Sequence, residues 1–96
     1  GGDIMLLEKY CKDTDLMIIQ FTIELTKDIH AKISARTLFY EEQVIRYANK
    51  RIRSFLHPLS LKHTLKFVYQ SEILQTILFK LKPTFEQQHV LRCISS

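Results

Sequence analysis

The chain has 96 residues, of which 46% are hydrophobic and 25% charged, and its formal net charge is +4 at pH 7. These values are typical of globular proteins and exclude a chain that stays disordered for lack of apolar residues. A membrane span needs about 18 consecutive apolar residues, and charged residues interrupt every candidate run here. The sequence therefore predicts one folded domain with a single core and no membrane span.

The start of the chain and its two cysteines indicate origin and compartment. Gly1 and Gly2 stand where an initiator Met is expected, and we interpret them as a cloning remnant. Residues 3–96 are then a single helical domain excised from a larger protein. Cys11 and Cys93 lie at opposite ends and form no CxxC pair, which favours a reducing compartment. We therefore expect an intracellular protein, nuclear or cytoplasmic.

The scarcity of Gly and Pro is the strongest indicator of fold class. Tight hairpins and phosphate-binding loops rely on Gly to reach positive φ, yet the chain has no Gly after Gly2. Pro58 and Pro83 are spaced as separators between helices. The sequence thus predicts an all-α fold, a compact bundle of about five or six helices.

Residues 3–26 contain the main ambiguity. Residues 3–12 have apolar positions at helical spacing, and the polar run 12–15 predicts a break in which Thr14 or Asp15 caps the next element. In residues 17–26 apolar and polar side chains alternate with the period of a strand, although some also fit helical spacing. We favour a helix and keep, as the alternative, an α+β fold with a strand near residues 17–26.

The clearest helical pattern extends from Ser34 to His57. This helix is expected to end before Pro58, because a residue that precedes proline is pushed out of the α region. Its charged residues lie mostly opposite one broad apolar face. That face comprises Tyr40, Val44, Tyr47, Ala48, Ile52 and Phe55 or Leu56.

The segment after Pro58 predicts three further helices. The apolar faces of residues 61–69 and 73–81 do not line up, which predicts a break near Gln70 and Ser71, with Ser71 as the cap of the later helix. Pro83 is expected to close that helix. Residues 84–87 then match a capping box, so a terminal helix is predicted up to Ile94.

Charge is unevenly distributed along the chain. Residues 1–45 contain five Lys or Arg against eight Asp or Glu, whereas residues 46–96 contain nine against two. Arg46, Lys50 and Arg53 are separated by four and three residues, which predicts that they share one helical face. A basic face of this kind attracts phosphates or acidic partners. The simpler interpretation is a solvated helix face. The candidate basic interaction face is Arg46, Lys50, Arg51, Arg53, Lys62 and Lys66.

No pattern in the sequence indicates catalysis, a metal site or a cofactor. His89 and Cys93 share a helix face at a spacing of four, but one pair supplies only half of a zinc site, which Cys11 or His57 would have to complete. HExxH, GxSxG and Gly-rich phosphate loops are absent. We assign no catalytic residue, no metal ligand and no cofactor, and we expect a protein that is not an enzyme.

Two aromatic residues stand off the predicted core faces. Phe39 lies off the main face of the Ser34 to His57 helix, and Phe79 lies opposite Leu74 and Leu78. Surplus apolar side chains of this kind indicate contact with a partner helix or a second copy of the chain, or packing inside a bundle that covers the helix on several sides. Phe39 and Phe79 are therefore the candidate apolar contacts.

These features favour a non-enzymatic protein–protein interaction or assembly domain, which binds a partner helix or associates with itself and carries a basic helix face. One alternative is a nucleic-acid-binding domain that contacts phosphates through residues 46–66. A second alternative is a regulatory subunit or domain of an enzyme. The expected partner is another protein or a second copy, with nucleic acid as an option and no membrane.

Overall fold

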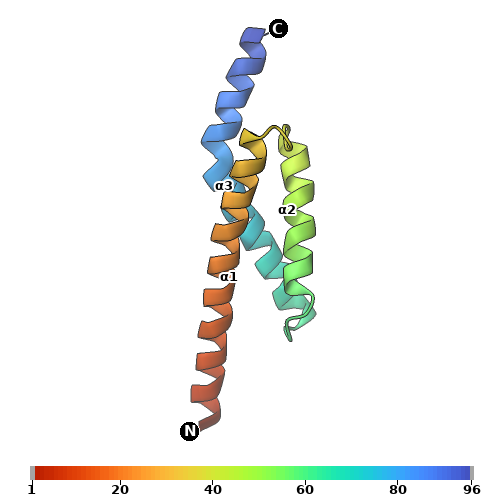
Figure 1. Ribbon diagram of the computed structural model, residues 1–96. Helices are drawn as coiled ribbons and strands as arrows, with labels where there is room; N and C mark the ends of the chain where they lie inside the picture. The colour runs from red at the N-terminus through yellow and green to blue at the C-terminus, as the bar shows by residue number, and fades with distance from the viewer. Residues whose placement is uncertain (1, 96) are drawn as a thin grey trace.

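The computed structural model describes the backbone of residues 2–95 and the side chains of residues 12–91 and of Cys93. Within this part of the chain there are three α-helices and no strand: α1 (Gly2–Ser34), α2 (Glu41–Leu56) and α3 (His63–Ser95). The molecule is elongated, with extents of 64 × 20 × 19 Å. Figure 1 shows α2 antiparallel to α1, and α3 crossing α1 before its C-terminal end extends past the other two helices.

The core lies where the three helices overlap. Most buried positions recur every four residues, so that each helix presents a ridge of the kind that packs into its neighbour's groove. A parallel stack of the Phe21 and Phe55 rings, with centroids 4.0 Å apart, joins α1 to α2 at the edge of the core. The buried apolar residues are Ile18, Leu25, Ile29, Leu38, Val44, Ala48, Ile52, Leu56, Ile73, Ile77 and Leu81.

The predicted bundle of five or six helices is wrong, because three of the predicted breaks lie inside helices, one in α1 and two in α3. At residues 12–15, Thr14 is buried on the core side of α1. Asp15 Oδ1 accepts a hydrogen bond from the Tyr69 hydroxyl of α3 at 3.4 Å. Tertiary packing thus keeps α1 continuous, since this stretch contains neither Gly nor Pro to interrupt it.

The predicted break at Gln70 and Ser71 is wrong for a different reason. The apolar face of α3 changes direction along the helix because its neighbours change: its first turns pack against α2, and its middle crosses α1 (Figure 1). Ser71 is therefore a mid-helix residue rather than a cap, and its Oγ accepts from the Gln75 side chain at 3.5 Å.

Pro83 also fails to end α3, so the predicted capping box at residues 84–87 and the separate terminal helix up to Ile94 are wrong. Proline removes the backbone donor that would reach the Phe79 carbonyl. Pro83 is exposed, so water can satisfy that carbonyl. On either side of it, Leu81 is buried and Phe85 packs against the core, which supports the helix across the proline.

Residues 17–26 are helical, and the α+β alternative is wrong. The strand-like alternation arises because this part of α1 is apolar on two sides. Leu25 faces the core, while Ile19 and Ile23 are 55% and 41% exposed. The buried hydroxyl of Thr26 donates to the Thr22 carbonyl at 2.7 Å, so a buried polar group has its partner within the helix.

The helix predicted for residues 34–57 begins later than expected. Residues 35–40 form a turn, and α2 starts at Glu41, where the Gln43 side-chain oxygen accepts from the backbone N–H of Tyr40 at 3.0 Å. Tyr40 is 46% exposed and is not part of the buried face. The predicted end before Pro58 is confirmed, because α2 ends at Leu56.

Arg36 closes α1 in a left-handed conformation, with φ of 61°. The Arg36 N–H donates to the Ile33 carbonyl at 3.0 Å, and the Thr37 N–H donates to the Lys32 carbonyl at 2.9 Å. These two bonds form a Schellman motif, in which glycine is the preferred residue at the left-handed position.

In the part of the chain that the structure describes, no helix is apolar and long enough to cross a membrane.

Candidate functional site

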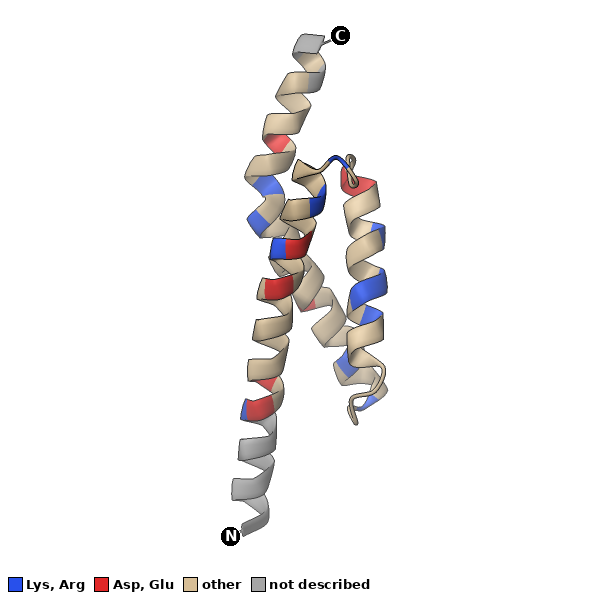
Figure 2. Cartoon of the chain, viewed as in Figure 1, with Lys and Arg blue, Asp and Glu red and all other residues tan. Residues whose placement is uncertain are grey.

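One face of α2 carries a basic stripe, defined here as Arg46, Lys50 and Arg53. At about 100° per residue these three side chains fall within about 60° of the helix circumference, and His57 continues the same line. All three are exposed. Figure 2 shows Lys and Arg along α2, with acidic residues only at its start. Among the described side chains, none of the three has an acidic group within ion-pair distance.

The stripe continues into a hollow where α2 ends and α3 begins. This first hollow has a volume of about 230 Å³, and Arg53 and His57 line it from the α2 side. From α3, Lys66 and Gln70 line it as well. The Lys66 ammonium donates to the His57 carbonyl at 3.3 Å, which joins the two helices at this point.

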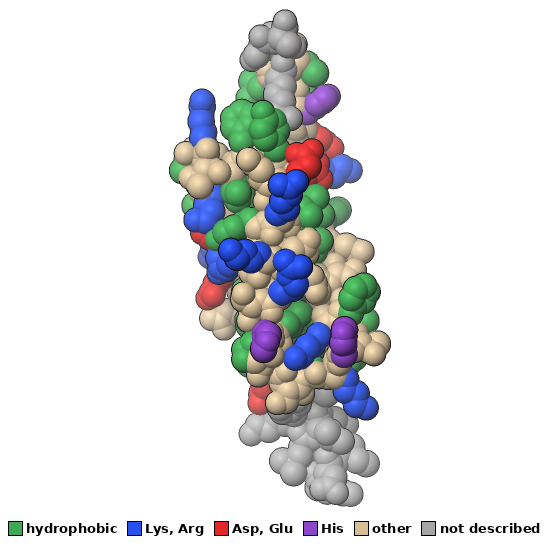
Figure 3. Space-filling view, turned by 90° about the vertical axis from the view of Figure 1, so that its right-hand side faces the viewer, with side chains coloured by type: hydrophobic (Ala, Val, Ile, Leu, Met, Phe, Trp, Pro, Cys, Tyr) green, Lys and Arg blue, Asp and Glu red, His purple; other side chains and the backbone are tan. Residues whose placement is uncertain are grey.

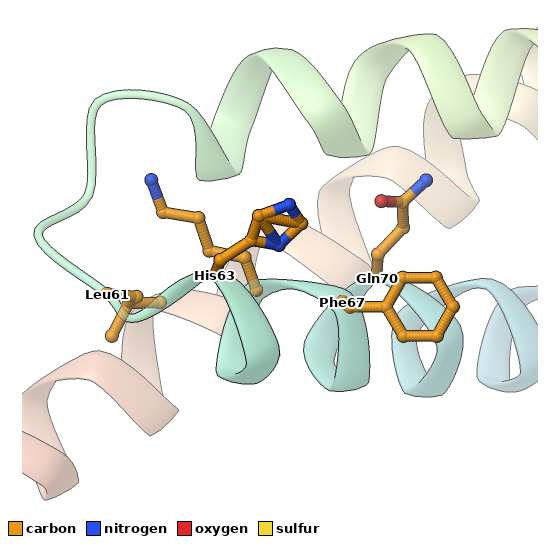
Figure 4. Close-up of a pocket in the computed structure, with 5 residues that line it drawn as sticks. Leu61, His63, Phe67 and Gln70 are labelled. Carbon is orange, nitrogen blue, oxygen red and sulfur yellow. The ribbon is translucent and has the colours of Figure 1, made fainter.

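A second hollow lies on the other side of Lys66 and Gln70. It has a volume of about 270 Å³, and its further lining residues are Leu61, His63 and Phe67. Figure 4 shows His63, Phe67 and Gln70 projecting from successive turns of α3, with Leu61 in the connection before the helix. Phe67 is 69% exposed. We call the two adjoining hollows the basic groove.

The charged residues that line the groove are all basic. Residues 43–71 contain no Asp or Glu, so the α2 face and the first turns of α3 have no local acidic residues. Figure 3 looks onto this side of the molecule: Lys and Arg run down its middle, and near the lower end two histidines flank a basic side chain. Lys62 is exposed in the connection before α3, between the lining residues Leu61 and His63.

Arg51, predicted as part of the basic face, points elsewhere and joins α2 to α1. Its Nη1 lies 2.9 Å from Asp28 Oδ2 and 2.8 Å from the Tyr47 hydroxyl oxygen. The Tyr47 hydroxyl also donates to Asp28, and Lys32 lies 3.6 Å from the other carboxylate oxygen. The hydrogen bond from Tyr47, aided by the charges of Lys32 and Arg51 and opposed by partial burial, lowers the pKa of Asp28 below its usual 3.8.

A second exposed surface, the C-terminal groove, runs along α3 on both sides of Pro83. Its volume is about 750 Å³, and Phe79, 78% exposed, stands at its edge. Val90 is 53% exposed near its far end. The lining residues are Glu41, Leu78, Phe79, Lys82, Phe85, Glu86, His89 and Val90.

The other candidates from the sequence are less well placed. Phe39 is 43% exposed, packs edge-on against Tyr40 and is not among the residues that line the C-terminal groove. Cys93 Sγ lies 3.7 Å from His89 Nε2. Among the described residues, no three or more His, Cys, Asp or Glu gather where they could hold a metal ion. The side chain of Cys11 lies outside the described residues.

No protein-family profile, curated protein or solved structure matches this chain. The basic groove and the C-terminal groove are the surfaces from which we argue a function below.

Sequence reasoning identified Phe79 but missed the residues that complete each surface. Phe67 and Gln70 had no distinguishing signal, because their importance comes from facing the end of α2 across a connection of six residues. Leu16, Ile19 and Ile23 were missed as exposed apolar positions on α1; the last two line a hollow of about 250 Å³ against α3. The sequence signal that could have found them is the pattern of apolar residues on two sides of the helix in residues 17–26.

Proposed function

We propose that this protein is a non-enzymatic assembly domain that associates with a second copy of itself through the C-terminal groove of α3. The observation that carries the proposal is the exposure of Phe79: its side chain is 78% accessible on an otherwise ordered helix. Exposing a large aromatic side chain gives up burial free energy of about 1.5–3 kcal/mol, which a partner surface can recover.

The charges of the groove favour a second copy as the partner. An interface with two-fold symmetry must be complementary to itself, so that each residue faces its symmetry mate. Lys82 and Glu86 lie four residues apart on the same side of α3 and both line the groove. In an antiparallel pair centred at the height of Thr84, each Lys82 faces Glu86 of the second copy.

The same arrangement places a side chain of the second copy opposite each exposed apolar residue of the groove. Positions equidistant from residue 84 meet, so Leu78 faces Val90 and Phe79 faces His89 of the second copy. Lys82 and Glu86 are two residues before and two residues after Thr84. At about 100° per residue, both lie on the side of α3 opposite Thr84, so Thr84 points away from the contact. Both copies would thus cover their exposed Phe79 in one closed contact, which cannot propagate into a fibre.

The test is sedimentation equilibrium of the whole chain and of its charge variants. Lys82→Glu and Glu86→Lys each place like charges opposite one another and are expected to weaken association by about tenfold or more. The double variant Lys82→Glu with Glu86→Lys restores opposite charges and is expected to recover most of the affinity. A partner of different sequence would not be rescued in this way.

Phe79→Asp supplies the second variant, and far-UV circular dichroism is its control. We expect this change to abolish the dimer while leaving the helical signal of the monomer intact, since Phe79 lies outside the core. A wild-type chain that stays monomeric at several hundred micromolar, or a double variant as weak as the single ones, would overturn the proposal.

A further inference from the structure

The basic stripe and the basic groove form one continuous surface on the side of the molecule shown in Figure 3. Arg53 belongs to both, because it is the last residue of the stripe and lines the first hollow. Lys66 and Gln70 line both hollows, so the surface continues without a gap to Phe67. None of these residues is used by the proposed contact along the C-terminal half of α3.

We infer that this surface binds single-stranded nucleic acid, with phosphates along Arg46, Lys50 and Arg53 and a base stacked on Phe67. The inference is independent of the proposed self-association. It assigns the groove a ligand class: a flexible polyanion with planar bases.

The charges of the surface select an anionic ligand with repeated charges. Arg46, Lys50 and Arg53 rise along the α2 axis in steps of about 6 Å and about 4.5 Å, at about 1.5 Å per residue. Since residues 43–71 contain no Asp or Glu, no acidic group of these two helical segments competes for the cations. A row of phosphates along this line is attracted by the three cations. Binding also releases counterions from the ligand, which favours the complex.

The aromatic residue favours a single strand over other polyanions. Phe67 is 69% exposed and lies between the positions of His63 and Gln70 on α3, beside Lys66 (Figure 4). Stacking on an aromatic ring requires an unstacked base, which a single strand offers and a duplex does not. The Gln70 amide, which offers both a donor and an acceptor, can hydrogen-bond a base edge in either hollow. A carboxylate side chain or a lipid phosphate offers no planar base to stack on the ring.

The experiment is a fluorescence-anisotropy titration of the whole chain against a labelled 12-residue oligo-dT at several salt concentrations. Parallel arms use the corresponding duplex, poly-glutamate and vesicles that contain phosphatidylserine. If Arg46, Lys50 and Arg53 each engage a phosphate, affinity for the single strand is expected to fall about 20-fold between 50 and 200 mM salt, roughly as the 0.7 power of salt for each contact.

Two variants separate the electrostatic and the stacking contributions. Arg46→Glu with Lys50→Glu and Arg53→Glu is expected to abolish binding. Its matched control, Lys12→Glu with Lys27→Glu and Lys80→Glu, changes net charge equally at exposed positions outside the surface and is expected to retain most of the affinity. Phe67→Ala is expected to weaken binding by about tenfold with an unchanged salt slope.

Several outcomes would overturn the inference. Tighter binding to poly-glutamate or to vesicles would identify an acidic protein or a lipid surface as the ligand. Tighter binding to the duplex, or no effect of Phe67→Ala, would remove the role of the unstacked base. Equal losses in the triple variant and in its matched control would show a response to net charge alone.

Discussion

Ile77 and Phe79 lie two residues apart on α3, yet their side chains are 0% and 78% exposed. Ile77 belongs to the ridge of Ile73, Ile77 and Leu81 that packs into the core, whereas Phe79 points to the opposite side of the helix. A larger apolar side chain is thus left in solvent while a smaller one is buried. Angular position relative to the neighbouring helices, rather than hydrophobicity, decides which residue stabilises the monomer.

The sharpest way to test this comparison is to truncate both residues. Ile77→Ala removes a buried side chain and leaves a cavity, so it is expected to lower the free energy of unfolding by about 2–5 kcal/mol. Phe79→Ala is expected to change it by less than about 0.5 kcal/mol, as for other exposed positions. Urea unfolding at a concentration where the chain is monomeric measures both. Similar losses in the two variants would mean that Phe79 is covered within one molecule.

Arg51 and Arg53 of α2 offer a similar comparison, between a charged residue that joins two helices and one that faces solvent. Arg51 is held by Asp28 and Tyr47 of a cluster that joins two helices, while Arg53 faces the solvent of the basic groove. Tyr47→Phe removes a hydrogen bond to a charged group and is expected to cost about 1–2 kcal/mol of unfolding free energy. Arg53→Ala, the control, is expected to cost less than about 0.5 kcal/mol.

The same cluster gives a pH dependence with a defined sign. The pKa of Asp28 is lower in the folded state than its usual 3.8, because Tyr47, Lys32 and Arg51 favour the carboxylate. Folding therefore releases a proton in the window below 3.8, and the contribution of Asp28 to stability is present above that value and is lost as the pH falls through the folded pKa. Urea unfolding between about pH 5 and about pH 2 measures the free energy of unfolding at each pH. This free energy should depend less steeply on pH in the Asp28→Asn variant than in the wild-type chain. If the variant and the wild-type chain had the same slope, groups other than Asp28 would account for the loss of stability in acid.

The smallest expected effect concerns the turn after α1. Arg36 adopts φ of 61°, where a side chain with a Cβ costs free energy that glycine does not. Arg36→Gly is therefore expected to raise the free energy of unfolding by about 0.5–1 kcal/mol. Arg36→Ala, which keeps the Cβ, should leave it nearly unchanged. Thermal unfolding of both variants measures the difference, and equal midpoints would contradict the strain at this residue.

The sequence by itself determined the helical class and much of the core. The absence of Gly after Gly2 left few ways to build tight turns, and the four-residue spacing of Val44, Ala48, Ile52 and Leu56 placed one buried face on the middle helix. The end of α2 before Pro58 was also predictable, because proline constrains the residue that precedes it. Phe79 was identified as an outward-facing residue from helical spacing alone.

Only the tertiary structure decided how many helices there are and which residues meet at the grooves. Thr14, Ser71 and Pro83 have local preferences for helix ends, but each of these preferences is worth only about 1–3 kcal/mol and packing on both sides of each residue outweighs it. Phe67 and the stripe residue Arg53 line adjoining hollows because α3 folds back along α2 at the basic groove. A local pattern describes the faces of one helix, and a site formed by two helices depends on where the connection between them places those faces.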